Sequence, residues 1–85
     1  MSSVSAQVSL YPLRQATIGS SIRGFVRVLR QRGLRTQVGE MSTVVWGEQD
    51  TVFDALKEAF RRATERGDTV MVVTLSNACS LPEGL

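Results

Sequence analysis

Apolar and polar residues alternate strictly over residues 4–11. The apolar members share one face: Val4, Ala6, Val8 and Leu10. A period of two over eight residues predicts a strand, and we expect it to end at Pro12, which has no N–H to donate. The opposite face is small and polar, and it either faces solvent or meets another subunit or a ligand.

Helical spacing follows this strand. Apolar residues at i, i+4, i+7, i+8 and i+11 predict an amphipathic helix of about three turns: Ile18, Ile22, Phe25, Val26 and Leu29. Thr17 or Ser20 is the expected N-terminal cap, and Gly33 is expected just past the helix end. We expect Gly24 to allow close packing against the sheet.

Three arginines follow one another at helical spacing on the polar side of this helix: Arg23, Arg27 and Arg30. Such a row either binds phosphate or forms a solvated face whose aliphatic stems cover neighbouring apolar surface. We prefer the second interpretation, because a row of charge on a helix usually faces solvent.

Two strands come next. Residues 34–41 are charged and only weakly apolar, which is typical of a strand at the edge of a sheet. Met41–Gly47 is apolar on both faces at Val44, Val45 and Trp46, which indicates a central strand. The short spacing predicts a hairpin with a tight turn near residues 40–42.

A second helix and a last strand complete the pattern. We expect a turn over residues 47–49, a cap at Asp50 and a helix to about Arg66, ended by Gly67. Its predicted buried stripe is Val52, Phe53, Leu56, Phe60 and Ala63. Residues 70–77 predict a strand, and the tail over residues 78–85 is expected to be irregular.

The element order is strand–helix–strand–strand–helix–strand. It predicts an α+β fold of the ferredoxin-like βαββαβ type, with a four-stranded antiparallel sheet and two helices on one face. Residues 1–85 are expected to form this single domain, with the first and third strands in the middle of the sheet. The uncovered face should carry Tyr11, or Trp46 and some valines, and we expect it to be an oligomer interface.

Composition excludes several classes of function. Ten basic residues against eight acidic ones give a net charge of only +2, which does not favour nucleic-acid binding. There is no histidine, and Cys79 is the single cysteine, so a Cys/His zinc site is not expected. No signal peptide and no membrane insertion are expected, because neither an early apolar segment nor a run of about 20 apolar residues occurs. The expected location is cytoplasmic.

No catalytic constellation is visible. Nucleophile–base pairs need a histidine or a cysteine with a basic partner, and neither arrangement occurs. The carboxylates of Glu40, Glu48 and Asp50 are interpreted as turn and cap residues. An acyl-phosphate hydrolase of the same fold uses an arginine in its first loop, where Arg14 lies, but the glycine-rich phosphate cradle is missing.

Three segments carry a resemblance to a known family: Ser9-Leu10-Tyr11-Pro12-Leu13, Ser42-Thr43-Val44-Val45-Trp46-Gly47 and Val52-Phe53-Asp54-Ala55. Together with the last strand and Cys79 they resemble one repeat of the thiamine-binding YkoF-like family. The resemblance implies a ferredoxin-like fold and binding of thiamine or its hydroxymethylpyrimidine half, linked to thiamine supply or transport. It also implies assembly through sheets, so a homodimer or homotetramer is expected.

The same resemblance implies the site. It places ligand contacts at Leu10 and at Thr43, beside Ser42. A planar aminopyrimidine suits a backbone edge plus a hydroxyl. Tyr11 or Trp46 could stack on a ring, and Glu40 could accept from the exocyclic amine. Thr43 and Trp46 should lie on opposite faces of their strand, so Trp46 is expected to serve packing.

The resulting prediction is a non-enzymatic small-molecule binding protein with no cofactor besides its ligand. Two alternatives stay open: a structural oligomeric module without a ligand, and a small acyl-phosphate hydrolase.

Overall fold

The architecture is seen in a computed structural model, which describes residues 2–14 and 18–78, without the side chain of Ile18. Its elements are β1 (Ser3–Pro12), α1 (Ile18–Gln31), β2 (Arg35–Val38), β3 (Thr43–Glu48), α2 (Gln49–Thr64) and β4 (Thr69–Ser76). The expected cap at Thr17, Cys79 and most of the expected irregular tail lie outside the described residues.

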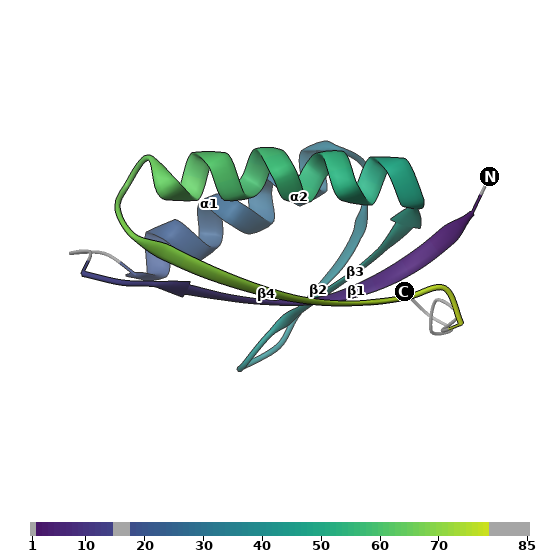
Figure 1. The fold of residues 1–85 in the computed structure, drawn as a ribbon, viewed down its shortest axis with the longest axis horizontal. Coiled ribbons are helices and arrows are strands. Elements are labelled where there is room, and N and C mark those ends of the chain that lie inside the picture. The colour runs from purple at the N-terminus through teal and green to yellow at the C-terminus, as the bar shows by residue number, and fades with distance from the viewer. Residues whose placement is uncertain (1, 15–17, 79–85) are drawn as a thin grey trace.

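The four strands form one antiparallel sheet in the order β2-β3-β1-β4. Both helices lie on the same side of the sheet, with α2 beside α1 (Figure 1). The predicted ferredoxin-like fold is therefore confirmed, with β1 and β3 in the middle and β2 at an edge, as the pattern of apolar residues indicates. The β2–β3 turn projects away from the helix layer (Figure 1).

The core lies between the helices and the inner face of the sheet. Its four largest fully buried side chains come from four different elements: Leu29, Val8, Val45 and Val52. On β1 the predicted alternation holds, since Val4, Ala6 and Val8 are all buried against the helices. Gly33 ends the first helix with φ 77°, the left-handed conformation that glycine adopts without steric cost.

The junction between β3 and α2 differs from the prediction of a turn over residues 47–49 and a cap at Asp50. The strand continues through Glu48, because Gly47 pairs with Val4 and Glu48 pairs with Ser3 on β1. Glu48 is itself the N-cap, and its carboxylate accepts a hydrogen bond from the backbone N–H of Thr51 at 3.0 Å.

The buried stripe of α2 is also different from the predicted one. Phe53 is 48% exposed and Phe60 is half-buried, whereas the buried positions are Val52, Ala55, Leu56, Ala59 and Ala63. Alanines face the core because small side chains let α2 lie close to α1 and the sheet. The large aromatic side chains are displaced to the flank of the helix.

The helix-free face of the sheet carries the residues expected there. Tyr11 is 48% exposed, while Trp46 is only 9% exposed and lies opposite Ser5 of β1. Val70 and Val72 of β4 share this face and are about half exposed, at 46% and 52%. An apolar area thus remains uncovered on the side of the sheet away from the helices.

Candidate functional site

A hollow of about 250 Å³ opens where the end of β1 faces the β2–β3 turn, beneath α1. We call it the strand-end hollow. All five residues that the sequence nominated for ligand contact line it: Leu10, Tyr11, Glu40, Ser42 and Thr43. Segments that are about thirty residues apart in the chain, 10–11 and 40–43, therefore meet at one site.

The outer wall of the hollow is the turn between β2 and β3. The backbone N–H of Gly39 donates to the carbonyl oxygen of Ser42 at 2.8 Å and closes the turn. A Cβ at position 39 would lie 3.1 Å from that oxygen, which is closer than side-chain carbons normally approach. Glycine therefore permits the tight closure that positions Glu40 and Thr43 at the hollow.

Thr43 lies at the bottom of this wall. It pairs with Val8 at the last position where β1 and β3 are joined, and it is 7% exposed. Its hydroxyl makes no hydrogen bond with the residues that the structure describes, and no buried side-chain oxygen is left unpaired among them, so the hydroxyl is accessible at the wall of the hollow. An accessible hydroxyl without a partner can donate to or accept from a polar group on a ligand.

Beyond Val8, β1 runs on to Pro12 with β4 on one side and no paired strand on the other. The strand ends at Pro12, as predicted, and Pro12 still pairs with Thr69 of β4. The edge is open because β3 begins only at Thr43. The end of β1 therefore offers backbone groups toward the hollow.

Ser42 and Tyr11 contribute differently from Leu10 and Thr43. The Ser42 hydroxyl accepts a hydrogen bond from the side-chain amide of Gln7 at 3.4 Å, and Gln7 belongs to the helix-free face. Successive strand residues point to opposite faces, so the side chain of Tyr11 starts from the face opposite to that of Leu10. Both residues border the hollow from its sheet side.

Sequence reasoning missed the roof and floor of the hollow. Ile22 and Phe25 of α1 and Val8 of β1 line it, although they were expected only to fill the core. The signal that could have found them is topological: an antiparallel sheet brings these positions beside the turn after β2. Trp46 is not among the lining residues.

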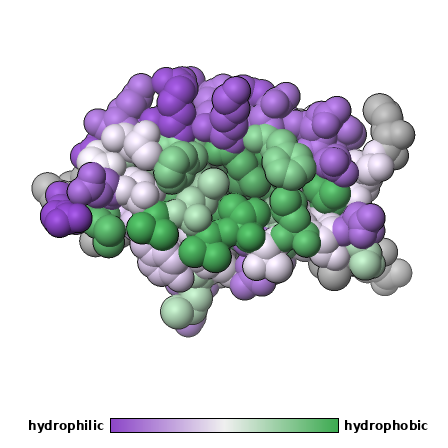
Figure 2. Space-filling model, viewed as in Figure 1, coloured by the Kyte–Doolittle hydropathy of each residue, from purple (hydrophilic) through white to green (hydrophobic). Residues whose placement is uncertain are grey.

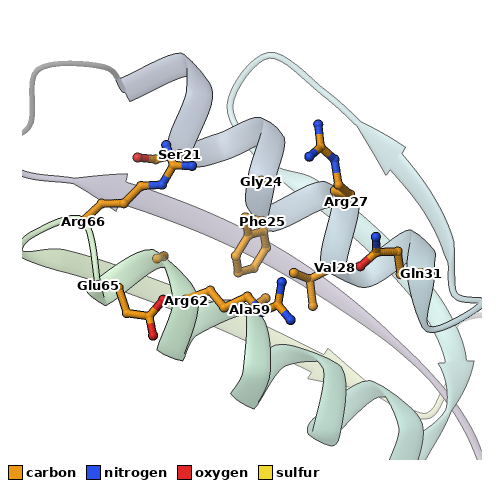
Figure 3. Close-up of a pocket in the computed structure, with 11 residues that line it drawn as sticks. Ser21, Gly24, Phe25, Arg27, Val28, Gln31, Ala59, Arg62, Glu65 and Arg66 are labelled. Carbon is orange, nitrogen blue, oxygen red and sulfur yellow. The ribbon is translucent and has the colours of Figure 1, made fainter.

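A second hollow, of about 270 Å³, lies between the outer sides of the two helices (Figure 3). The prediction that Gly24 allows close packing against the sheet is wrong. Gly24 borders this inter-helix hollow, and a Cβ there would find nothing within 4 Å. Of the three arginines that line it, two have partners: Arg62 pairs with Glu58 at 3.2 Å, and Arg66 donates to the Ser20 hydroxyl at 3.1 Å. None of the five residues nominated for ligand contact lines this hollow.

The two carboxyl groups with shifted pKa values, Glu48 and Glu58, lie outside the strand-end hollow. The pKa of Glu48 is lowered chiefly by the hydrogen bond from the Thr51 backbone, and the pKa of Glu58 is lowered chiefly by the hydrogen bond from Arg32. Both carboxylates serve the structure of α2, as an N-terminal cap and in ion pairs with Arg32 and Arg62. Neither lines the strand-end hollow.

Arg14, the arginine of the hydrolase alternative, has φ 55° and forms an ion pair with Asp68 at 3.3 Å. Over residues 2–14 and 18–78, no group of three or more His, Cys, Asp or Glu residues is placed to hold a metal ion. None of the helices in that part of the chain is long and apolar enough to span a membrane.

Solved structures with this fold come from distant organisms. A hypothetical protein of Methanocaldococcus jannascii matches with a TM-score of 0.84 and 24% identity, over 100% of this chain and 90% of that one. A domain of unknown function from Bacillus cereus matches with a TM-score of 0.79 and 22% identity, over 96% of this chain and 84% of that one. A candidate thiamine biosynthesis or salvage protein of Thermotoga maritima matches with a TM-score of 0.77 and 20% identity, over 86% of this chain and 81% of that one.

At such identities these likenesses concern the fold alone. No curated protein matches this chain. The model of the YkoF-related family matches residues 3–81, which include every strand and helix described above. The chain therefore belongs to the YkoF-related family.

Proposed function

We propose that the strand-end hollow binds thiamine or its hydroxymethylpyrimidine half, and that the protein serves thiamine supply or transport as a non-catalytic binding protein. Membership of the YkoF-related family and the likeness to the Thermotoga maritima protein support a thiamine-related role. The observation that carries the proposal is the convergence of Leu10, Glu40 and Thr43 on one hollow.

The size of the hollow favours one ring. Sites for drug-sized ligands usually measure about 300–1,000 Å³, so about 250 Å³ suits a single substituted heteroaromatic ring. The pyrimidine is the ring with donors and acceptors in one plane, and we place it in the hollow. The thiazolium half of thiamine would then extend out of the mouth.

Three kinds of polar group can form hydrogen bonds with such a ring. The Thr43 hydroxyl can donate or accept, the open edge of β1 near Leu10 supplies backbone groups, and the Glu40 carboxylate can accept from the exocyclic amine. Val8, Ile22 and Phe25 supply apolar surface for the faces of the ring. Buried ligand sites commonly combine a few polar groups with such a lining.

Isothermal titration calorimetry with hydroxymethylpyrimidine and thiamine tests this function. We expect saturable binding with one ligand per chain, competition between the two compounds, and a higher melting temperature in their presence. Trp46 fluorescence is a poor primary signal, because Trp46 does not line the hollow. Absence of binding of both compounds at millimolar concentration to folded protein would contradict the proposal.

The alternatives give different results in the same set of measurements. A structural module without a ligand would show no heat of binding. An acyl-phosphate hydrolase would release phosphate from benzoyl phosphate, and Arg14→Ala would abolish that release. Arg14 is engaged with Asp68, so we expect no hydrolysis above the rate in buffer.

We also propose that the chain forms a homodimer or homotetramer through the helix-free face. Tyr11, Val70 and Val72 expose large apolar side chains there. On the flank where α2 and β4 lie nearest the viewer, Figure 2 shows a further band of apolar surface. Contiguous apolar surface of this kind usually marks an interaction site. A stable monomer in sedimentation equilibrium at about 100 μM protein would contradict this part of the proposal.

A further inference from the structure

A shallow groove of about 520 Å³ adjoins the strand-end hollow along α1. Ile22 and Val38 line both the hollow and the groove, so the two share a wall. The groove has an apolar floor formed by these two residues and Val26, and its rim carries Arg23, Arg27 and Arg30. We call it the arginine groove.

The three arginines of this groove are not engaged in ion pairs with carboxylates of the described residues. They are exposed, and α1 contains no Asp or Glu. The only carboxylate lining the neighbouring hollow is that of Glu40. By contrast, Arg14, Arg32, Arg61 and Arg62 each have an acidic partner.

Arg23 is the arginine nearest the first turn of α1. Its terminal nitrogen lies 3.2 Å from the position that a Cβ on Gly19 would take, so the guanidinium lies back along the helix toward residue 19. Glycine leaves room for that orientation. Arg27 and Arg30 follow at the next turns and line the groove together with Val26 and Val38.

We propose that the ligand of the strand-end hollow is a phosphate ester, with its ring in the hollow and its phosphate in the arginine groove. This inference rests on the proposed function, because it assumes that the ring occupies the hollow. A substituent leaving the hollow past Ile22 and Val38 enters the groove, where guanidinium groups can hold phosphate oxygens by charge-assisted hydrogen bonds.

Charge favours the ester over the unmodified compounds. Thiamine carries a positive thiazolium, which the arginine row repels, and hydroxymethylpyrimidine is neutral. A phosphate group adds about 1.5 to 2 negative charges near neutral pH and reverses the sign of the interaction. The second interpretation from the sequence, a merely solvated arginine face, predicts no preference between ester and alcohol.

Calorimetry at low and moderate salt tests the inference with four ligands and one ion: hydroxymethylpyrimidine, its phosphate, thiamine, thiamine monophosphate and inorganic phosphate. We expect each ester to bind about ten-fold more tightly than its alcohol, with the preference falling as salt rises. Arg23→Gln and Arg27→Gln should reduce the preference, whereas binding of unphosphorylated hydroxymethylpyrimidine should stay unchanged. Arg61→Gln, an exposed arginine on α2, is the matched control.

The outcomes separate the two proposals. Equal binding of ester and alcohol would overturn the phosphate inference and leave the ring-binding function in place. Inorganic phosphate that binds as tightly as the esters would also overturn it, because the groove would then be a general anion site. Failure of all four ring compounds to bind would overturn both. Circular dichroism of each variant verifies that the exposed substitutions leave the fold intact.

Discussion

Thr43 lies directly opposite Val8 across the two central strands, at the point where their pairing ends and the strand-end hollow begins. The pair joins a polar group to the apolar floor of the hollow. Because both side chains are nearly buried, at 7% and 2% exposed, a ligand that reaches them is largely removed from water.

Replacing the hydroxyl of Thr43 by a methyl group should weaken ligand binding. We expect Thr43→Val to bind hydroxymethylpyrimidine about ten-fold less tightly, because one buried hydrogen bond is lost and a polar group of the ligand is left unpaired. The melting temperature should change little, since valine fills the same space beside Val8. Titration calorimetry of both proteins measures the difference.

Thr74→Val is the matched control for that experiment. Thr74 lies opposite Gln7 and is exposed on the helix-free face, away from the hollow. Unchanged affinity in Thr43→Val would remove Thr43 from the site, and an equal loss in Thr74→Val would point to a general effect of the substitution.

Replacing either of two glycines by alanine should change the stability of the protein, in opposite directions at the two positions. A Cβ at Gly47 would collide with the side chain of Leu34 in the core, so we expect Gly47→Ala to destabilise the protein by about 1–3 kcal/mol. A Cβ at Gly24 would enter open space beside the inter-helix hollow (Figure 3), so Gly24→Ala should stabilise it by about 0.5–1 kcal/mol. Urea denaturation measures both, and a stabilised Gly47→Ala protein would contradict the close packing at Leu34.

The cap of α2 should make stability depend on acidity. The pKa of Glu48 is lowered in the folded protein, first by the Thr51 backbone N–H and then by that of Asp50. When the pKa of a carboxylate is lower in the folded than in the unfolded protein, its charge stabilises the fold. This stabilisation is complete above the unfolded pKa and is lost as the pH falls through the folded pKa. Stability should therefore decrease as the pH falls below about 4.5.

Glu48→Gln isolates this contribution. The variant should melt at a lower temperature than the parent at pH 7, because the neutral amide is a weaker acceptor for the Thr51 N–H, and the gap should narrow at pH 3. Glu40→Gln at the exposed turn removes one negative charge without touching a cap and serves as the control. A gap that is the same at both pH values would show that the Glu48 charge does not support the helix.

Self-association should depend on the exposed apolar residues of the helix-free face. Val72 is 52% exposed there and lies opposite Ser9 of β1, so Val72→Lys places a charge in the proposed interface. We expect the variant to sediment as a monomer with an unchanged circular dichroism spectrum. Lys57→Glu on α2 is the control, and dissociation by the control alone would place the interface on the helices.

The fold was predictable because its determinants are periodic. Alternation on β1 and the doubly apolar Val44-Val45-Trp46 segment predict strands and a central position, and the sheet order confirms both. The junction at Glu48 was wrongly predicted because it depends on how far β1 extends as a partner, which is a pairing between distant residues. Phe53 was wrongly predicted as buried because periodicity does not show how closely two helices approach.

The candidate site was only partly accessible from the sequence. The resemblance nominated residues on two segments, but it gave no reason for Ile22 and Val38 to join the hollow to a basic groove. That junction depends on where a helix crosses the end of a short edge strand. The arginine spacing was visible from the sequence, whereas the lack of ion pairs around it emerges only from the structure.

The shortness of β2 has a consequence for access to the hollow. This strand has only four residues, is mostly exposed, and is held to the sheet by β3 alone. Segments with few buried contacts open locally at a lower free energy than the whole molecule unfolds. Amide protons of residues 35–38 should therefore exchange early, and the wall at Val38 can separate from α1 while the core around Leu29 and Val45 stays closed.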